Sequence, residues 1–422
     1  MSDFDMMALP PKLAERVAAA GLTTPTPIQA QAIPHALNGR DVMGLAQTGT
    51  GKTAAFGIPL IARLMEEGGR PAPKSARGLV LAPTRELAAQ IAKVLRDLTD
   101  LRVQIVVGGV SINPQIQRLT KGADIMVATP GRLLDLVERR AIKLDQTNFL
   151  VLDEADQMLD LGFVHALRKI ASLMGDDRQT MLFSATMPKQ MAEIAQSYLR
   201  EPIRVEVSPP GKAADKVTQE VHFIAKAEKS ALLIELMDKH RENRALVFTR
   251  TKHGADRLAR NLDKAGFAVA AIHGDKRQGQ RERALAAFKA REIRVLVATD
   301  VAARGLDIPD VRYVYNYELP NVPEAYVHRI GRTARAGKEG QAVALCAPDE
   351  MPHLKDIQKV MKIAIPVASG RPWEELPDPA AKPQGRGRGR GRPGGRPGGK
   401  PGGAPGTSKS SNRRRRKPKP KA

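Results

Sequence analysis

Residues 41–53, DVMGLAQTGTGKT, place a short apolar run directly before a glycine-rich loop, and a long stretch with helical periodicity follows. Gly49 and Gly51 let backbone N–H groups approach phosphate oxygens, Lys52 brings a positive charge to the β- and γ-phosphates, and Thr53 offers a hydroxyl to Mg²⁺. The stretch therefore predicts a nucleotide phosphate loop, and the alternative is a glycine turn without a ligand. Its residues are Ala46, in the place where the generic loop has Gly, then Gln47, Thr48, Gly49, Thr50, Gly51, Lys52 and Thr53.

A second polar signature ends the apolar run FLVL at 149–152, which continues into DEAD at 153–156. Two adjacent carboxylates at a strand end can hold Mg²⁺ and polarise a water against a γ-phosphate. We expect Asp153 to be the metal partner, together with Thr53, and Glu154 to be the general base. An acidic strand end on its own is more often a solvated helix cap, but the phosphate loop upstream favours the catalytic interpretation.

Short runs rich in Val, Ile and Leu recur along the chain and alternate with longer stretches of helical periodicity. This alternation is typical of a parallel sheet covered by helices. Nearly every run ends in a polar signature, and ligands of open parallel sheets bind beyond the carboxyl ends of the strands. Because the pattern occurs in both halves of the chain, we predict two tandem α/β domains with parallel sheets covered by helices.

Breaker residues without an apolar period, SPPGKAAD at 208–215, separate the two halves. We therefore expect an N-terminal domain over 1–207, a linker over 208–218 and a C-terminal domain over 219–370. Over 371–422, Gly, Pro and basic residues dominate and apolar side chains are nearly absent, which predicts a disordered tail.

The formal net charge of +23 favours a polyanionic partner such as nucleic acid over a neutral metabolite. Residues 378–422 carry 15 Lys or Arg and one Asp, a net of +14, so +9 belongs to the rest of the chain. Arg alternates with Gly over 386–392, and 413–417 is a solid basic block. Such segments bind RNA through phosphate charge and guanidinium stacking; the alternative is a solubilising linker.

The single cysteine, Cys346, allows no disulfide within the chain and no cysteine-based metal site. It lies in the apolar run GQAVALCAP, which indicates core packing. The N-terminal stretch MSDFDMMALPPKLAERV lacks a basic region followed by an apolar one, and no later run approaches membrane-spanning length. We expect a soluble, cytoplasmic protein.

Several motifs resemble the signature set of the DEAD-box RNA helicases and occur in that family's order. They are AQTGTGKT at 46–53, PTREL at 83–87, TPGR at 129–132, DEAD at 153–156, SAT at 184–186 and HRIGRTAR at 328–335. The resemblance covers residues 4 to about 365. It implies two RecA-like domains, RNA-stimulated hydrolysis of ATP with Mg²⁺, and RNA as the partner. The sequence around the motifs and the basic tail are most similar to the bacterial RhlE group.

The resemblance also assigns the adenine end of the nucleotide. Phe4 and the stretch GLTTPTPIQ at 21–29 resemble the Q motif, in which Phe packs on adenine and Gln29 contacts its edge. This implies a preference for ATP over GTP. Without the family, Thr24-Pro25-Thr26-Pro27 is a stiff helix entry and Gln29 a surface amide.

Further motifs follow strands, where similar helicases grip the RNA backbone. An arginine beside a helix start is more often part of a local ion pair, but the repeated placement at strand ends favours a shared groove. The RNA-binding residues implied are Thr84, Arg85, Gly109, Thr129, Arg132, Arg250, Gln278, Arg281, Thr299 and Arg304.

The motif HRIGRTAR places Arg332 and Arg335 three apart, on one face if helical, so both are expected to reach the γ-phosphate as arginine fingers. The alternative is a basic helix face in solvent. Asp307 resembles the residue that meets the ATP ribose, and Ala334 departs from the Gly of many relatives. The residues implied to couple RNA binding to hydrolysis are Asp156, Ser184, Thr186, Asp300 and His328.

The expected activity is local, largely non-processive unwinding of RNA duplexes or remodelling of RNA–protein complexes. A DNA helicase or translocase would share the phosphate loop and the acidic strand end, and a non-enzymatic RNA chaperone or annealing protein would act through the basic tail. The Q motif and the DEAD spelling favour the RNA helicase. Ribosomal precursors, RNA-decay complexes and cold-stabilised RNAs are all compatible targets, and we expect a monomer with association through the tail as an open alternative.

Overall fold

The computed structural model describes residues 4, 7–46, 49–207, 217–303, 311–334 and 339–373. These residues belong to one compact unit, Met1–Glu375, and the second unit, Leu376–Ala422, lies outside the described residues. Two seven-stranded sheets organise the first unit. We call the described part of residues 4–207 the first lobe and that of residues 217–373 the second lobe.

The first lobe is built on a sheet with the strand order β3-β4-β2-β5-β6-β1-β7. All of its strand pairs are parallel. Its strands are β1 (Val42–Leu45), β2 (Ala76–Leu81), β3 (Val103–Val106), β4 (Ala123–Ala128), β5 (Phe149–Leu152), β6 (Gln179–Ser184) and β7 (Ile203–Glu206).

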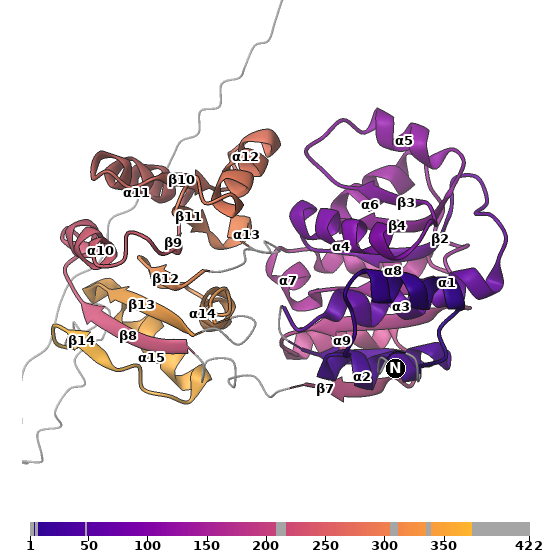
Figure 1. Cartoon of the computed structure of the whole chain (residues 1–422), viewed down its shortest axis with the longest axis horizontal. Helices are drawn as coiled ribbons and strands as arrows, with labels where there is room; N and C mark the ends of the chain where they lie inside the picture. The colour runs from indigo at the N-terminus through magenta and orange to yellow at the C-terminus, as the bar shows by residue number, and fades with distance from the viewer. Residues whose placement is uncertain are drawn as a thin grey trace, which may run out of the picture. The chain divides into compact units, whose positions relative to one another are not determined.

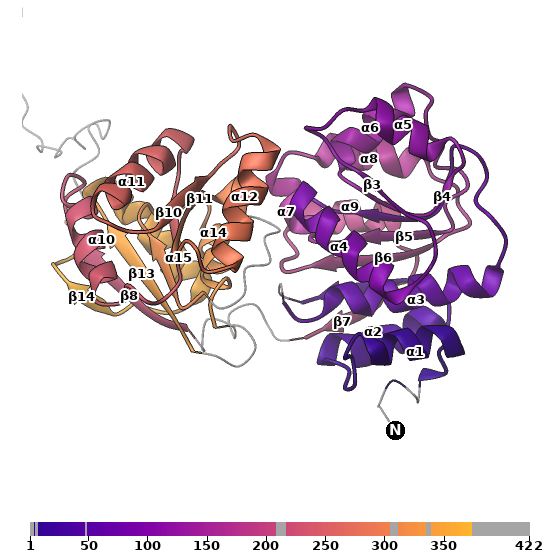
Figure 2. The same cartoon turned by 45° about the horizontal axis from the view of Figure 1, so that its top comes forward.

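Helices cover both faces of this sheet (Figures 1 and 2). One face packs against α1 (Pro11–Ala19), α2 (Pro27–Leu37), α3 (Lys52–Glu67) and α4 (Arg85–Leu98). The other packs against α5 (Asn113–Leu119), α6 (Pro130–Glu138), α7 (Ala155–Asp160), α8 (Val164–Leu173) and α9 (Lys189–Tyr198). The central strands are apolar throughout because neither face of the sheet meets water.

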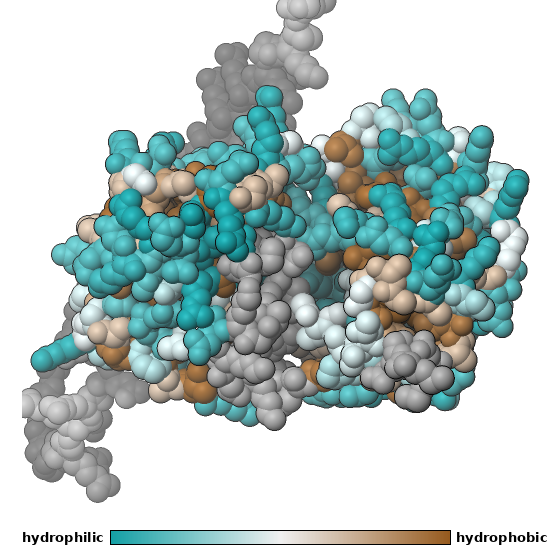
Figure 3. Space-filling model, in the orientation of Figure 1, coloured by the Kyte–Doolittle hydropathy of each residue, from teal (hydrophilic) through white to brown (hydrophobic). Residues whose placement is uncertain are grey.

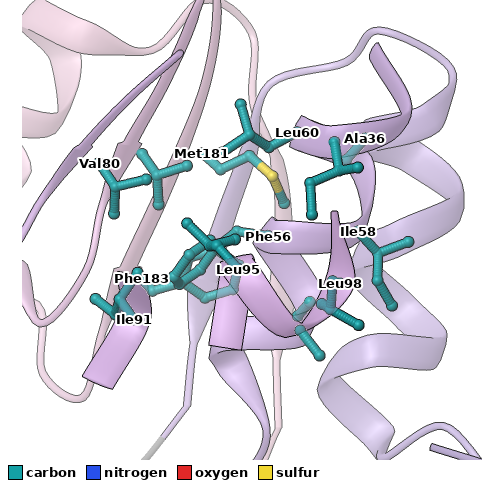
Figure 4. Close-up of a cluster of buried hydrophobic side chains, with 14 of the residues drawn as sticks. Ala36, Phe56, Ile58, Leu60, Val80, Ile91, Leu95, Leu98, Met181 and Phe183 are labelled. Atoms are coloured by element: carbon teal, nitrogen blue, oxygen red, sulfur yellow. The ribbon is translucent and has the colours of Figure 1, made fainter. Parts of the chain in front are cut away.

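Alternate residues of each central strand enter different cores. On β2, Val80 belongs to the cluster under α3 and α4, whereas Leu79 and Leu81 belong to the cluster on the opposite face. Figure 4 shows the first of these clusters, in which Val80, Met181 and Phe183 of the sheet face side chains of the covering helices. Phe56 and Phe183 pack with ring centroids 5.7 Å apart.

The second lobe has the strand order β10-β11-β9-β12-β13-β8-β14, again with every pair parallel. Its strands are β8 (Val217–Phe223), β9 (Ala245–Thr249), β10 (Val269–Ile272), β11 (Val295–Thr299), β12 (Tyr313–Asn316), β13 (Gly340–Cys346) and β14 (Val367–Ser369). The predicted fold class, two α/β lobes with parallel sheets, is therefore confirmed.

Helices also cover both faces of the second sheet. On one face lie α10 (Lys229–Asp238) and α11 (Lys252–Lys264). On the other lie α12 (Gln278–Lys289), α13 (Asp300–Ala303), α14 (Pro323–Ile330) and α15 (Met351–Met361), with the short 3₁₀ helix η3 (Pro348–Glu350) leading into α15.

The C-terminal end of the described chain packs onto the second lobe. Trp373 contacts the core cluster under α14 and α15. Its Nε1 donates a hydrogen bond to the carbonyl of Cys346 (3.1 Å), and Cys346 is itself buried. On the face drawn in Figure 3 the described surface is mostly hydrophilic, with scattered hydrophobic side chains.

A matched pair of leucines tests the core of the first lobe. Leu95 on α4 is fully buried and packs against Gly57 of α3, whereas Leu173, the last residue of α8, is 37% exposed. Leu95→Ala is expected to lower the free energy of unfolding by about 2–5 kcal/mol through lost contacts and a residual cavity. Leu173→Ala should change it by less than about 1 kcal/mol. Denaturant unfolding measures both, and equal effects would contradict the described core.

Candidate nucleotide and RNA sites

The predicted phosphate loop connects β1 to the N-terminus of α3. Gly49 and Gly51 have φ angles of +86° and +88°, a region that side chains other than Gly adopt only with strain. Lys52 is the first residue of α3, so it lies where free backbone N–H groups and the helix dipole favour an anion. Gln47 and Thr48 lie outside the described residues.

Gln29 holds this loop from α2. Its Nε2 donates to the carbonyl of Gly51 (3.0 Å), and its Oε1 accepts from the backbone N–H of Thr26 (2.9 Å). A Cβ at Gly51 would lie 2.5 Å from Gln29 Nε2, so the Gln29 contact itself requires glycine there. Phe4, the other residue of the predicted adenine site, is 3% exposed and belongs to the core of the first lobe.

Lys52 and Asp153 form a buried pair of opposite charges. Lys52 Nζ lies 3.8 Å from Asp153 Oδ1, and the two side chains are 6% and 3% exposed. Nζ makes no hydrogen bond to any described residue, although a buried ammonium normally requires several. Burial raises the pKa of Asp153, with Lys52 acting in the opposite direction. A phosphate would place negative charge beside the Lys52 ammonium, and a divalent cation would place positive charge beside the Asp153 carboxylate.

Glu154 has a strained backbone at the end of β5. Its φ and ψ are 52° and 50°, the left-handed region, and it stands directly before the first residue of α7. Side chains other than Gly, Asn and Asp seldom adopt this conformation, which costs about 1–2 kcal/mol. Such strain occurs preferentially at functional sites. Glu154 is 2% exposed, next to Asp153.

The carboxylate of Asp156 links the end of β5 to the end of β6. Its Oδ2 accepts from the backbone N–H groups of Ala185 (3.1 Å) and Thr186 (2.9 Å) and from Thr186 Oγ1 (3.0 Å). Ser184 does not reach this carboxylate in the same way, because its Oγ accepts from the backbone N–H of Asp156 (3.3 Å) and donates to the carbonyl of Thr186 (2.6 Å). The structure therefore brings Asp156, Ser184 and Thr186 into one hydrogen-bonded group.

On the first lobe Arg85 and Gly109 meet directly. Arg85 is the first residue of α4, which is capped by Thr84 Oγ1 accepting from Leu87 N (3.2 Å). A Cβ on Gly109, whose φ is +72°, would lie 1.7 Å from Arg85 Nη1. Only glycine lets this guanidinium lie across the loop.

Two of the other predicted RNA residues lie at the start of α6. Thr129 precedes its first residue and is 7% exposed. Arg132 Nη1 donates to the carbonyl of Val110 (3.1 Å), and its Nε lies 3.5 Å from a carboxylate oxygen of Asp135. Arg132 thus takes part in the local ion pair that was the alternative to an RNA contact.

Gln115, which no motif indicated, supports the loop that contains Gly108 and Gly109. It is 5% exposed and lies on α5. Its amide accepts from Val107 N (3.0 Å) and donates to the carbonyls of Val107 (3.2 Å) and Ser111 (3.1 Å). Only its spacing after the Gly108–Gly109 pair could have suggested this role.

In the second lobe Asp300 is held by Arg329, which the sequence analysis also missed. Arg329 Nε and Nη2 donate to the two oxygens of Asp300 (2.6 and 2.8 Å), and its side chain is 1% exposed. Nη1 donates to Asn316 Oδ1 (3.0 Å) and to the carbonyl of Glu318 (2.7 Å). Arg329 belongs to HRIGRTAR, but its burial directs it inward as a structural clamp.

The remaining predicted residues of the second lobe are scattered over its elements. Thr299 ends β11 and is 8% exposed, while Gln278 and Arg281 lie in the first turn of α12. Arg250 follows β9, and its guanidinium lies within 4 Å of the carboxylates of Asp349 and Glu350. Arg304, Asp307 and Arg335 lie outside the described residues.

His328 and Arg332 lie at the end of α14 and just beyond it. Together with Asp300, Arg329 and Phe248 they line a small cavity of the second lobe. Arg332 is 3% exposed, so it is a buried group rather than part of a solvated basic face.

Ala334 has a φ of +55°, a conformation that a glycine would adopt without strain. The turn is fixed on both sides, because Thr333 Oγ1 lies 3.0 Å from the carbonyl of Arg312 and a Cβ on Gly340 would lie 2.6 Å from Ala334 N. Ala334 departs from the glycine of many relatives, and its left-handed φ shows that the cost of this departure lies in the backbone.

Family models match most of the two lobes. One described as DEAD/DEAH box helicase matches residues 26–194, and one described as helicase conserved C-terminal domain matches residues 228–337. An ATP-dependent RNA helicase CshA of Listeria monocytogenes is 43% identical over 378 residues, which cover 89% of this chain and 72% of the relative. The DEAD-box ATP-dependent RNA helicase CshA of Bacillus subtilis is 45% identical over 345 residues, or 81% and 69% of the two chains.

Solved structures of similar fold contain RNA. Dbp5 of S. cerevisiae bound to RNA and ADP BeF3 has a TM-score of 0.78 and 32% identity, with 87% of this chain and 96% of that one covered. Mss116p bound to ssRNA and AMP-PNP has a TM-score of 0.78 and 29% identity, with 87% and 78% covered. In the described part of the present chain, no helix has the length and apolar character that crossing a membrane requires.

Ala334→Gly is expected to raise the free energy of unfolding by up to about 1.6 kcal/mol. It removes a left-handed strain of about 1–2 kcal/mol, and part of this gain is offset by the freer unfolded chain, worth about 0.4–1 kcal/mol. Ala286, exposed on α12, is the matched control, and Ala286→Gly should lower stability by about 0.5–1 kcal/mol. Midpoints of denaturant unfolding distinguish the two; a destabilised Ala334→Gly variant would refute the strain.

Proposed function

Because the chain belongs to the family of DEAD-box ATP-dependent RNA helicases, we propose that it couples ATP hydrolysis to local separation of RNA strands through the residues described above. The buried Lys52 ammonium, without a hydrogen-bond partner among the described residues and 3.8 Å from Asp153, carries this proposal. The Lys52 ammonium could donate hydrogen bonds to an anionic partner, a phosphate, while the adjacent Asp153 carboxylate could bind a cation.

The phosphate loop and α3 would bind the phosphates of ATP, with Lys52 at the β- and γ-phosphates. Thr53 and Asp153 would hold Mg²⁺, which when bound neutralises phosphate charge and orients the γ-phosphate. Glu154 would accept a proton from the attacking water. Its fixed, strained backbone orients the carboxylate without further ordering during the reaction.

Phe4 and Gln29 would select adenine. Gln29 already supports Gly51 through a hydrogen bond, so a contact between its amide and the base would be transmitted directly to the phosphate loop. This arrangement favours ATP over GTP.

Coupling to RNA would run through hydrogen bonds at strand ends. The Asp156 carboxylate holds Thr186 by its backbone N–H and its hydroxyl, so a displacement of the loop after β6 changes the hydrogen bonds of the DEAD motif itself. In the second lobe, Asp300 is joined to α14 through Arg329, and α14 leads to Arg332. Asp300, His328, Ser184 and Thr186 are the proposed coupling residues.

We expect the two lobes to close when ATP and RNA bind together. Closure would bring Arg332 and Arg335 to a phosphate held by Lys52, and Asp307 to the ribose. Hydrolysis would therefore require bound RNA. The RNA backbone would lie against residues at the carboxyl edges of both sheets. These are Thr84, Arg85, Gly109, Thr129, Arg132, Arg250, Gln278, Arg281, Thr299 and Arg304.

The finer assignments are also proposals. The domains would be 1–207 and 219–370, joined by 208–218 and followed by an RNA-binding tail over 371–422, although Val217 already belongs to β8 and Trp373 packs on the second lobe. The protein would act in the cytoplasm, and its place near the RhlE group rests on the sequence around its motifs.

Glu154→Gln is expected to lower RNA-stimulated kcat by about 100-fold or more while ATP and RNA still bind, because the general base is lost. Lys52→Ala should instead lose nucleotide binding. Glu15→Gln and Lys12→Ala, at exposed positions of α1, are the matched controls and should behave as wild type. ATPase assays with and without RNA, together with nucleotide-binding titrations, measure these effects.

The rate with and without RNA decides the coupled mechanism. Hydrolysis at equal rates in both conditions would rule out RNA-gated turnover, and normal hydrolysis by both variants would show that the site is misassigned.

Removing residues 378–422 is expected to weaken RNA affinity, most strongly at low salt, because this segment carries a net charge of +14. ATPase turnover at saturating RNA should be retained. A tail of equal length with Lys and Arg replaced by Ser is the control for length alone. RNA binding measured over a salt series tests the effect, and an unchanged affinity would leave the tail as a linker.

A further inference from the structure

The second lobe repeats the first strand by strand. The orders β3-β4-β2-β5-β6-β1-β7 and β10-β11-β9-β12-β13-β8-β14 match position by position. β8 therefore corresponds to β1, β12 to β5 and β13 to β6. The connection from β8 to α10 then occupies the position that the phosphate loop occupies in the first lobe.

Lys229 stands where the phosphate-loop lysine stands. Each is the first residue of the helix that follows, α10 and α3 respectively. Lys52 Nζ faces Asp153, the first residue after β5. Lys229 Nζ donates to the carbonyl of Tyr317 (2.8 Å), the first residue after β12.

The loop before Lys229 is not suited to phosphate. Residues 224–228 read IAKAE and contain no glycine, and none of them has the left-handed φ angles that Gly49 and Gly51 give the phosphate loop. Lys229 is nevertheless 1% exposed, and a buried ammonium needs an anion.

Glu350 supplies this anion from η3. Its carboxylate accepts from Lys229 Nζ and from the backbone N–H groups of Leu319 (3.0 Å) and Ala347 (2.9 Å), and Arg250 Nη2 lies 3.6 Å away. An ammonium, a guanidinium and two backbone N–H groups are the donors that usually surround a bound phosphate. Glu350 is 1% exposed, so its carboxylate is as deeply buried as the Lys229 ammonium that it pairs with.

We propose that Glu350 is a built-in anion that fills the second lobe's counterpart of the phosphate site, and that Lys229 and Glu350 position the β12–α14 connection for RNA-stimulated ATP hydrolysis. They are positioning residues, since neither belongs to the ATP or RNA site described above.

The contacts of this pair lead to the coupling residues. Lys229 fixes the carbonyl of Tyr317 and Glu350 fixes the N–H of Leu319. The residue between them, Glu318, accepts from Arg329 Nη1 through its carbonyl (2.7 Å). Arg329 in turn binds both oxygens of Asp300. The pair therefore holds the segment on which the Arg329 clamp depends.

Stability and positioning are separate roles for the pair, and substitutions distinguish them. A buried ion pair can often be replaced by apolar side chains of similar size without loss of stability, whereas removal of one partner leaves an unpaired buried charge. The double variant Lys229→Met/Glu350→Leu separates the two roles, because it removes both charges and keeps much of the packing.

The first experiment is anion rescue of full-length Glu350→Ala. Its vacated site retains Lys229, Arg250 and the two backbone donors, so sodium formate should raise its thermal midpoint and partly restore its RNA-stimulated kcat. Sodium chloride at the same concentration should do neither. Lys229→Met/Glu350→Ala lacks the ammonium but keeps the Arg250 guanidinium and the backbone donors, so it should respond to formate clearly less than Glu350→Ala. Equal responses of the two variants, or no response of Glu350→Ala, would overturn the built-in anion.

One further variant, Glu350→Gln, protects this test against misfolding. Glu350→Gln keeps the shape and an acceptor oxygen, so it should fold; its thermal midpoint should lie below that of the wild type because the neutral amide leaves Lys229 without an anion. A midpoint of Glu350→Gln equal to that of the wild type would also overturn the proposal.

The second experiment is kinetic and rests on the proposed RNA-gated function. In Lys229→Met/Glu350→Leu, RNA-stimulated kcat should fall by roughly 10- to 100-fold, as for displaced catalytic groups, while KM for ATP stays that of the wild type. Wild-type kcat in a folded double variant would overturn the positioning role. If the wild-type protein showed no RNA-stimulated hydrolysis, the proposed function would be refuted instead. The effect of formate on the thermal midpoint of Glu350→Ala would still test whether Glu350 acts as a built-in anion.

Discussion

Parallel pairing of β1 with β6 and of β6 with β5 is the constraint on which the nucleotide site depends. It places the carboxyl ends of three strands side by side, and a different residue set follows each of them. The phosphate loop follows β1, the DEAD motif follows β5, and Ala185 and Thr186 follow β6. Charges that are about a hundred residues apart along the chain thereby become neighbours, as the 3.8 Å between Lys52 Nζ and Asp153 Oδ1 shows.

The same constraint acts twice in this chain, and the two lobes use it differently. In the first lobe the helix-initial Lys52 is buried without a hydrogen bond to any described residue. In the second lobe the corresponding Lys229 donates to two carbonyls and to Glu350. A buried ammonium is costly unless its partners are present. One lobe leaves that cost to be offset by a ligand, and the other offsets it with its own side chain.

Backbone strain occurs at both ends of the proposed chemistry. Glu154 and Ala334 have φ angles of 52° and 55°, each beside a residue with an assigned charge role. At Glu154 the strain sets the direction of a carboxylate at a strand end. At Ala334 it tightens the turn that follows Arg332. Backbone hydrogen bonds from Gln157 and Met158 to its carbonyl hold Glu154, and the close approach of Gly340 holds Ala334.

Sequence alone determined the two parallel α/β lobes and the loops that carry chemistry, because apolar runs of strand length and the motifs after them are local patterns. The roles of Arg329, Gln115, Lys229 and Glu350 were decided only by the tertiary structure. Arg329 looks like the other arginines of its motif, but burial turns it toward Asp300 and Asn316. Lys229 and Glu350 are far apart in sequence and carry no motif. Their pairing follows from the order of strands in the sheet, which brings α10, the end of β12 and η3 together around the buried Lys229 ammonium.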